Sequence, residues 1–184
     1  MTEIVNVSKN WAIGKKGCLL VHLKEDMAFF RNTTRHKVCL MGSVTLESFP
    51  RMAPLRDRVN IVLVDDEKKI RPESVQAAEE DRAAGRSTEL IYVFSLEEAL
   101  EKLAAYDKDD VFVVGGAGVY RLMLPYADKC LVTHNDAEIP DADAYFPDLD
   151  ATGEWTLAEQ GEEKEENGVR FRFCTYVRNG AAKE

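Results

Sequence analysis

The sequence predicts an α/β fold with a mainly parallel, twisted central sheet of about eight strands and helices on both faces. Up to residue 135, short apolar runs alternate with segments of helical period, an order that is typical of parallel sheets. After residue 135 the pattern changes, and two strand-like runs, 155–160 and 169–177, flank an acidic stretch. These two runs predict an antiparallel C-terminal hairpin at the edge of the sheet.

The length and composition fit one globular domain, residues 1–184, in the cytoplasm. A chain of 184 residues can bury a sizeable core but leaves little room for a second domain. The net charge of −9 argues against a nucleic-acid-binding protein. The four cysteines form no CxxC pair, which favours reduced thiols over a disulfide framework or a metal site. The sequence shows neither a signal peptide nor an apolar run long enough for a membrane span.

The first elements are a short buried strand, a glycine-containing loop and a helix. Residues 4–8 form an apolar run, and residues 10–22 follow with two glycines, two lysines and no steady hydrophobic period. Leu23, Met27 and Phe30 then recur at helical spacing, which predicts one apolar helix face.

The remaining elements follow from apolar runs and from turn and capping residues. Five further strands are predicted at 37–41, 59–64, 90–94, 111–114 and 129–135. Helices are predicted at 43–49 with Ser43 as its cap, after Ser95 with Glu98 in a capping box, and between Gly115-Gly116 and Pro125. The charged, alanine-rich segment 71–89 predicts either a surface helix that ends near Gly85 or an ordered insertion.

Asp26 lies inside the apolar face of the first helix, because it follows Leu23 by three residues and precedes Phe30 by four. A carboxylate in such a place must find a hydrogen-bond partner, raise its pKa or serve a ligand. The alternative is an ordinary first-turn acid beside Glu25, favoured by the helix dipole. This stretch alone leaves both interpretations open.

Three candidate features follow strands of the predicted sheet, where open α/β sheets bind their ligands. They are the 10–22 loop and the two glycine turns at 42–45 (GSVT) and 115–120 (GGAGVY). Glycine turns that lead into helices expose backbone N–H groups, which phosphates favour. Together with Asp26, the two turns indicate a dinucleotide and a second ligand.

Seven segments of the chain occur in an order and spacing that are specific to one family: NWAIGKKG, HLKEDMAFFRNTT, MGSVTLESFP, LRDRVNIVL, VVGGAGVY, LPYADKCLVTH and DADAYFPD. Through these segments the chain resembles the bacterial dihydrofolate reductases over nearly its whole length. The resemblance implies a dihydrofolate-reductase-like fold and an NADPH-dependent reduction of 7,8-dihydrofolate to 5,6,7,8-tetrahydrofolate, with hydride transfer to C6 and protonation of N5. It further implies a role in one-carbon metabolism, antifolate inhibitors as ligands and a monomeric protein. The charge and the lack of a long apolar run add the expectation of no nucleic-acid and no membrane partner.

The resemblance also implies the residues that bind the substrate. Asp26 matches the catalytic carboxylate that hydrogen-bonds the pterin N3 and 2-amino group, and Thr133 matches the hydroxyl that orients it. Arg58 matches the arginine that binds the α-carboxylate of the substrate's glutamate. The full set of substrate-binding residues is Ile4, Val5, Met27, Phe30, Leu55, Arg58 and Val114, with Ile4 and Val114 acting through their carbonyl groups.

The residues implied for the cofactor come from four segments. They are Asn6, Ala12, Ile13, Gly14, Lys15, Gly17 and Leu19 in the mobile loop over the nicotinamide; Gly42, Ser43, Val44 and Thr45; Leu63, Val64 and Asp65; and Gly115, Gly116, Ala117, Gly118, Val119 and Tyr120, where the resemblance implies a cis Gly-Gly bond.

The chain departs from the family pattern at three places. Leu20-Val21 replaces the common Pro-Trp, so the water that the tryptophan holds near the substrate must be held otherwise. Ser43 stands where an arginine is common and Asp65 where a hydroxyl residue is common, which weakens the expectation of strict NADPH preference. The segment 68–89 is longer than in compact members and has no assigned function.

Two alternatives remain at this stage. One is the reductase of riboflavin synthesis that shares this fold, and the other is a binding module that holds folate or nucleotide without turnover. The combination of Asp26, Phe30 and Arg58 fits a folate better than the substrate of the riboflavin-pathway reductase. The presence of both Asp26 and Thr133 argues against a module without turnover.

Overall fold

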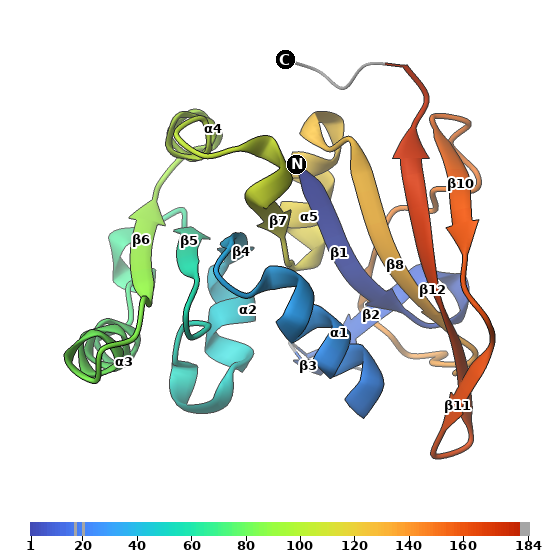
Figure 1. Ribbon diagram of the computed structural model, residues 1–184, viewed down its shortest axis with the longest axis horizontal. Helices are drawn as coiled ribbons and strands as arrows, with labels where there is room; N and C mark the ends of the chain where they lie inside the picture. Colours follow the sequence, from blue (N-terminus) through green and yellow to red (C-terminus); the bar gives the residue numbers. More distant parts are fainter. Residues whose placement is uncertain (17, 20, 181–184) are drawn as a thin grey trace.

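A twisted sheet with β1 near its centre organises the molecule (Figure 1), in a computed structural model that describes residues 1–16, 18–19 (backbone alone) and 21–180. In spatial order the strands are β10 (Trp155–Gln160), β12 (Val169–Arg178), β8 (Lys129–Asn135), β1 (Thr2–Val7), β7 (Val111–Val113), β4 (Val38–Gly42), β5 (Val59–Leu63) and β6 (Glu89–Val93), and β11 (Lys164–Glu166) pairs with β12.

The pairing confirms the predicted fold class. From β8 to β6 all neighbouring strands run parallel, whereas β12 is antiparallel to β8, β10 and β11. The C-terminal segment is thus the expected antiparallel addition at the sheet edge. Part of the acidic stretch between its two long strands, expected only to separate them, forms β11 and the turn that follows it.

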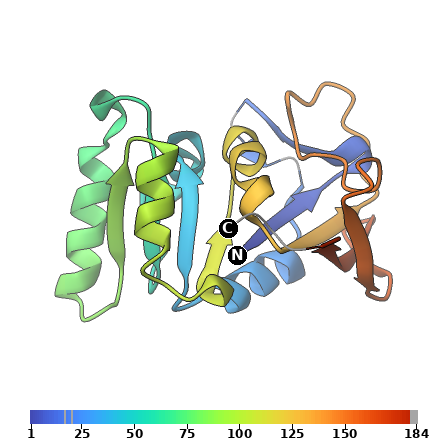
Figure 2. The same ribbon diagram turned by 90° about the horizontal axis from the view of Figure 1, so that it is seen from above.

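Helices cover both faces of this sheet, with α1 and α5 on opposite sides of β1 (Figures 1 and 2). The α-helices are α1 (Lys24–Thr34), α2 (Ser43–Ser48), α3 (Pro72–Ala83), α4 (Leu96–Leu103) and α5 (Ala117–Met123); short 3-10 turns lie at Lys9–Trp11, Pro50–Met52, Glu67–Lys69, Lys108–Asp110 and Leu124–Tyr126.

Helix ends test two of the capping predictions. Ser95 caps α4 as predicted, because its Oγ accepts a hydrogen bond from the Glu98 N–H at 3.1 Å. The prediction that Ser43 caps α2 is wrong, since Gly42 is the N-cap and Ser43 is already helical. The surface helix predicted at 71–85 is confirmed as α3, and Gly85 follows it with a φ of 81°.

The expectation of an irregular loop at 10–22 is wrong for six of its residues. β2 (Ala12–Lys15) pairs with β3 (Cys18–Leu19) and with β9 (Ala144–Tyr145), which makes a second, three-stranded sheet. The N–H of Lys16 also donates to Asp143 Oδ2 at 2.9 Å, and Lys15 forms an ion pair with Asp141. Pairing with a segment far along the chain orders a stretch that lacks a hydrophobic period of its own.

The apolar core on the α5 side of β1 contains a buried glutamate, a residue that is rare in protein cores. Val5 and Val7 of β1 pack there with buried residues such as Tyr120 and Phe146. Glu3 of β1 is fully buried, and among the described residues neither of its carboxyl oxygens has a hydrogen-bond partner. Burial therefore raises the pKa of Glu3 well above its usual value, and the nearby Arg178 lowers it by less.

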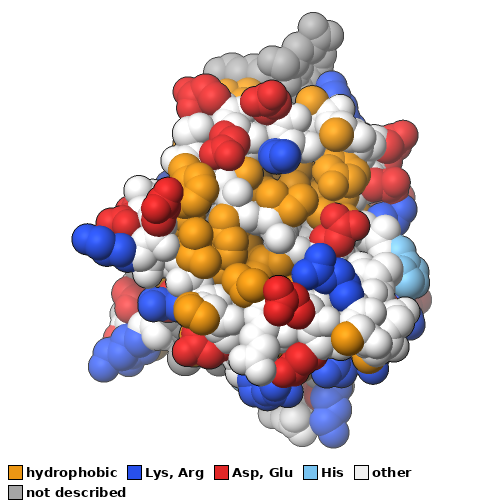
Figure 3. Space-filling view, turned by 90° about the vertical axis from the view of Figure 1, so that its left-hand side faces the viewer, with side chains coloured by type: hydrophobic (Ala, Val, Ile, Leu, Met, Phe, Trp, Pro, Cys, Tyr) orange, Lys and Arg blue, Asp and Glu red, His pale blue; other side chains and the backbone are white. Residues whose placement is uncertain are grey.

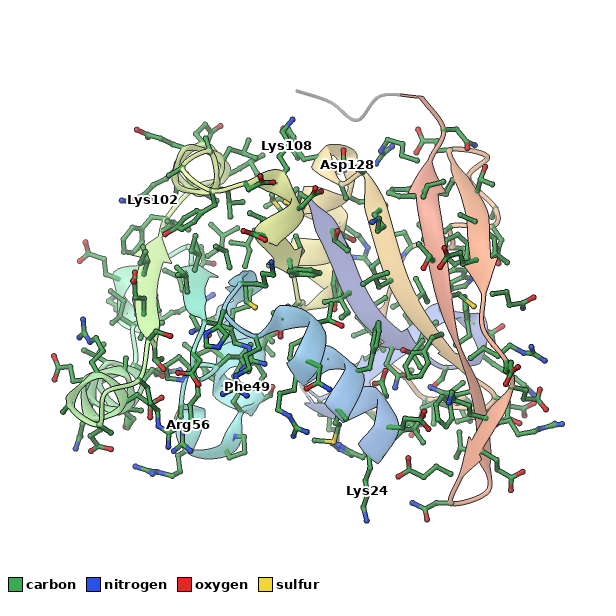
Figure 4. The ribbon with its side chains drawn as sticks, viewed as in Figure 1. Lys24, Phe49, Arg56, Lys102, Lys108 and Asp128 are labelled. Carbon is green, nitrogen blue, oxygen red and sulfur yellow. The ribbon has the colours of Figure 1, made fainter. Side chains whose placement is uncertain are left out.

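Two ion pairs connect separate elements of the fold. The N-terminal ammonium group of Met1 lies 2.6 Å from Asp128 Oδ2, which stands just before β8 (Figure 4). Arg56 reaches α3, where its Nε lies 3.3 Å from Asp81 Oδ1 (Figure 4).

On the face over the β6 edge, hydrophobic side chains gather among charged ones (Figure 3). The described helices include none that is both long and apolar enough to cross a membrane.

Candidate active site

Asp26 lies on α1 and faces the ends of two central strands. Its Oδ1 accepts a hydrogen bond from the Thr133 hydroxyl of β8 at 2.6 Å, and its Oδ2 accepts one from Asn6 Nδ2 of β1 at 2.8 Å. Burial raises the pKa of Asp26, and the hydrogen bonds from Thr133 and Asn6 lower it. Of the two interpretations of Asp26, the geometry favours a carboxylate held in place over an exposed first-turn acid.

Asn6 belongs to this polar cluster, although it was predicted only among the cofactor residues. Its Oδ1 accepts from Asn135 Nδ2 at 2.7 Å, and Asn135 Oδ1 accepts from the Ala137 N–H at 3.0 Å. Sequence reasoning missed Asn135. Asparagine is unfavourable in strands, so two asparagines within apolar strand runs were the available signal.

A carboxylate from the C-terminal hairpin caps the helix that carries Asp26. Glu166 Oε1 accepts from the Lys24 N–H at 2.9 Å, and its Oε2 accepts from the Glu25 N–H at 3.3 Å. Lys164 of β11 adds an ion pair to Glu25 at 2.6 Å. In Figure 4, the Lys24 side chain at the start of α1 points away from the body of the protein. Sequence reasoning missed this cap, because no local pattern links Glu166 to α1.

Several of the apolar side chains predicted to bind the substrate are exposed or half-buried. Met27 is 53% exposed, and Phe30 and Leu55 are half-buried. Phe49, Val114 and Leu55 pack against a second cluster of buried residues, which consists of Cys39, Met41, Leu46, Val62 and Val64. Phe49 projects between α2 and α1 in the view of Figure 4. A flat aromatic ligand requires apolar side chains of this kind, and Met27, Phe30, Leu55, Phe49 and Val114 are together called the apolar wall.

Two strand carbonyls were predicted to accept from the substrate's amino group, and one of them already has a partner. The Tyr120 hydroxyl donates to the Ile4 carbonyl oxygen at 2.7 Å. A carbonyl oxygen has a second lone pair, so the Ile4 group retains accepting capacity. Ile4 and Val114 lie on β1 and just after β7, which are neighbouring strands. Val5 lies in the main core, where its side chain points away from Asp26.

Arg58 is 7% exposed and is fixed by three hydrogen bonds. Its Nε donates to Thr34 Oγ1 at 3.1 Å, and its two terminal nitrogens donate to the carbonyls of Arg56 and Arg31 at 2.7 and 2.9 Å. Each terminal nitrogen has a second N–H, so the guanidinium retains a pair of donors for a carboxylate. The arginine is therefore held rigidly with donors to spare.

The two glycine turns lie against each other at the ends of β4 and β7. The Gly42 N–H donates to the Gly115 carbonyl at 2.9 Å, and the Gly115-Gly116 bond is cis, as the resemblance implies. A Cβ on Gly42 would lie 3.1 Å from Val119, and Gly115 has a φ of 115°. Within the described residues, α2 and α5 have no side-chain cap, and Val44 is 61% exposed. Close glycine packing and open helix starts suit a pyrophosphate group.

Asp65, which was predicted among the cofactor residues, and the segment that follows it carry their own ion pairs. Asp65 lies 2.6 Å from Lys69 Nζ, and Arg71 Nε lies 2.8 Å from Glu47 Oε1. Both cations come from the segment after β5 whose role was left open. Each is already matched by an acid of this chain.

The other predicted cofactor residues lie in or beside these elements. Ala12 and Ile13 are buried in β2, Gly17 lies outside the described residues, and only the backbone of Leu19 is described. Leu63 ends β5 and Val64 follows it, while Ala117 and Gly118 begin α5. The described residues bring no group of three or more His, Cys, Asp or Glu side chains together in a way that could hold a metal ion.

Comparisons with known proteins agree with this geometry. The family model described as dihydrofolate reductase matches residues 1–178. Relatives named dihydrofolate reductase include those of Schistosoma mansoni (34% identity over 96% of this chain and 95% of the relative), Neisseria gonorrhoeae (34%, 96% and 97%) and Bacillus subtilis (31%, 98% and 95%). The riboflavin-pathway reductase and the non-catalytic module are not favoured by these matches. The chain belongs to the dihydrofolate reductase family.

Proposed function

We propose that this chain reduces 7,8-dihydrofolate to 5,6,7,8-tetrahydrofolate at the site around Asp26, with NADPH as the hydride donor. The observation that carries the proposal is the Asp26 carboxylate, which is held by Thr133 and Asn6 beside an apolar wall. The family to which the chain belongs supports the reaction. The residue roles are those that the resemblance implies, and the geometry of these residues is compatible with them.

The pterin ring binds along the apolar wall with its polar edge on Asp26. Each carboxylate oxygen accepts one protein donor and keeps a lone pair, so the pair of oxygens can accept the adjacent N3 and 2-amino donors of the ring. Met27, Phe30 and Leu55 contact the ring and the aminobenzoyl portion. The carbonyls of Ile4 and Val114 contribute further acceptors for the ring's polar edge.

Arg58 binds the α-carboxylate of the substrate's glutamate with its two remaining donors. Its hydrogen bonds to Thr34 and to the carbonyls of Arg56 and Arg31 hold the guanidinium plane in place before the substrate arrives. A preorganised planar donor loses little entropy when it binds a carboxylate.

The residues at the second site fit a nicotinamide dinucleotide. When bound, the reduced nicotinamide supplies the hydride. The turns at Gly42 and Gly115 would hold the pyrophosphate, and the strands β2 and β3 would cover the nicotinamide end and exclude water from the reacting atoms.

NADPH is the proposed cofactor, and the residues near its 2′-phosphate make the preference over NADH modest. Ser43 offers a hydroxyl, and Asp65 repels a phosphate unless Lys69 offsets it. The Lys69 and Arg71 ion pairs would have to open or share their cations with the phosphate.

The protein's part in proton transfer is to hold the substrate while solvent water protonates N5. Asp26 binds the ring as an anion and raises the basicity of N5, and Thr133 fixes the orientation of the carboxylate. Burial raises the pKa of Asp26, which brings its titration closer to the working pH.

Further parts of the proposal concern the whole protein. The family match over residues 1–178 supports a single domain. The buried free thiols of Cys39, Cys130 and Cys174 fit a reducing cytoplasm. We expect a monomer that binds antifolates which carry the same donor pair as the pterin.

The test is the loss of reduced-cofactor absorbance when dihydrofolate is added, run in parallel with NADPH and NADH. Turnover with NADPH supports the proposed function, and turnover with both cofactors supports a modest preference. If neither cofactor supports turnover, the proposal fails.

A further inference from the structure

Asp26 accepts its second hydrogen bond from Asn6, which in turn accepts one from Asn135. We propose that Asn6 and Asn135 are positioning residues that hold an amide N–H on the Asp26 carboxylate. The consequence for turnover rests on the proposed function. The effect on Asp26 itself rests only on the hydrogen bonds. The side chain of Val21, which stands where the family commonly carries tryptophan, has no hydrogen-bond donor.

Strand register brings the chain of side chains together. Asn6 lies directly opposite Thr133 in the parallel pair of β1 and β8, so both side chains point to the same face of the sheet. Asn135 follows Thr133 by two residues and therefore shares that face. Asp26 on α1 bonds Thr133 and Asn6, since α1 covers this side of β1 (Figures 1 and 2), and Asn135 bonds Asn6 in turn.

The direction of the amides is determined by a backbone group. The Ala137 N–H can only donate, so the atom of Asn135 that lies 3.0 Å away must be its oxygen. Asn135 then presents its NH2 group to Asn6 at 2.7 Å, which makes the facing atom of Asn6 an oxygen. Asn6 must therefore present its own NH2 group to Asp26 at 2.8 Å. Every link of this chain has one orientation.

An amide donor that is fixed on Oδ2 favours the ionised form of Asp26. Burial raises the pKa of Asp26 and favours its neutral form, whereas the proposed substrate contact needs the carboxylate. Thr133 and Asn6 both lower this pKa, each from a different oxygen. An isolated Asn6 could rotate its amide and present an oxygen instead. Asn135, which is 7% exposed, prevents that rotation.

Charged groups on the neighbouring elements do not supply this effect. These groups are Lys24 and Glu25 on α1, Lys164 and Glu166 on β11, Glu3 on β1, Tyr120 on α5, His134 on β8 and Arg172 on β12. Glu166 accepts from the Lys24 and Glu25 N–H groups, and Lys164 pairs with the Glu25 carboxylate. Lys24 and Glu25 are exposed, and Arg172 donates to the Gly161 carbonyl. Glu3 lies on the opposite face of β1, and burial raises the pKa values of Glu3 and Tyr120 well above normal, which favours their neutral forms. Burial also lowers the pKa of His134, which favours its neutral form.

The experiment measures the ionisation of Asp26 in the ligand-free protein by carbon-13 NMR of its carboxyl group across pH. Asn6→Ala removes the donor, and Asn6→Asp keeps the size of the side chain but replaces its NH2 group by an oxygen. Asn135→Ala leaves Asn6 free to rotate. Asn32→Ala, at an exposed position on α1, is the matched control.

We expect the titration midpoint of Asp26 to rise in both Asn6 variants, to rise less in Asn135→Ala and to stay unchanged in Asn32→Ala. The acidic limb of kcat/KM for dihydrofolate should move to higher pH in the same order, with a loss of about tenfold at neutral pH in Asn6→Ala. An unchanged midpoint in both Asn6 variants would overturn the inference. The proposed function fails separately, if the wild-type protein shows no turnover, because the NMR titration needs no substrate.

Discussion

Replacing the buried Glu3 should stabilise the protein at neutral pH. Both carboxyl oxygens lack partners among the described residues, and the side chain is fully buried in the main core. An unpaired buried polar group costs about 1–3 kcal/mol in mutational data. Glu3→Met keeps an unbranched chain and removes both oxygens, so it should raise the free energy of unfolding by about 2 kcal/mol. For a chain of this size, that is a rise of about 4–8 °C in Tm.

The pH dependence separates ionisation from burial. Burial raises the pKa of Glu3 in the folded protein above the ordinary value of 4.5. Below pH 4.5 the side chain is protonated in both states, and this group causes no pH-dependent loss of stability. Above it the unfolded chain releases the proton that the folded protein retains, so folding becomes less favourable as pH rises toward the raised pKa. The glutamine in Glu3→Gln cannot ionise. The free energy of unfolding of this variant should therefore match that of the wild type at acid pH and exceed it at neutral pH.

Thermal and urea unfolding at acid and neutral pH would measure both variants, with Glu89→Gln at an exposed position as the control. The reasoning is refuted if Glu3→Gln and Glu3→Met are both less stable than the wild type at neutral pH. That result would mean that Glu3 is ionised in the folded protein and is stabilised by the charge of Arg178.

The remaining predictions concern the active site and its support. Asp26→Asn should lower kcat/KM at neutral pH by at least about 100-fold without lowering Tm, and an unchanged rate would exclude the proposed role. Arg58→Lys should raise the KM for dihydrofolate by about tenfold, because one ammonium replaces two parallel donors; an unchanged KM would contradict the carboxylate contact. Asp65→Ser should free Lys69 and lower the KM for NADPH several-fold relative to NADH, and an unchanged ratio would place the phosphate elsewhere. Glu166→Ala should cost about 1 kcal/mol of stability, measured in urea, through loss of the α1 cap.

Local patterns predicted most of the sheet and the central acid. Apolar runs marked the strands of the parallel sheet, and the helical spacing of Leu23, Met27 and Phe30 placed Asp26 on the inner face of α1. Ser95 was a correct cap because its partner Glu98 lies within the same turn. These features depend on residues that are near one another in the sequence.

The features that the sequence did not predict depend on distant pairs. β2 becomes a strand because it pairs with Ala144–Tyr145, more than a hundred residues later. The resemblance assigned Asn6 to the cofactor. Its place beside Asp26 was not predicted, because its register with Thr133 and its contact with Asn135 arise only when β1 and β8 pair. Tertiary pairing decided both outcomes, and no local period could have signalled it.

The Glu166 cap has a consequence for the order in which the protein can mature. The first N–H groups of α1 are satisfied by a residue more than 140 positions later, and β12, which leads from the same hairpin, pairs directly with the strand that carries Thr133. During synthesis on a ribosome, Asp26 therefore emerges early, but its helix start and its hydroxyl partner's strand remain incomplete until the last part of the chain is released. A nascent chain of this protein would acquire its folate-binding geometry only at the end of translation.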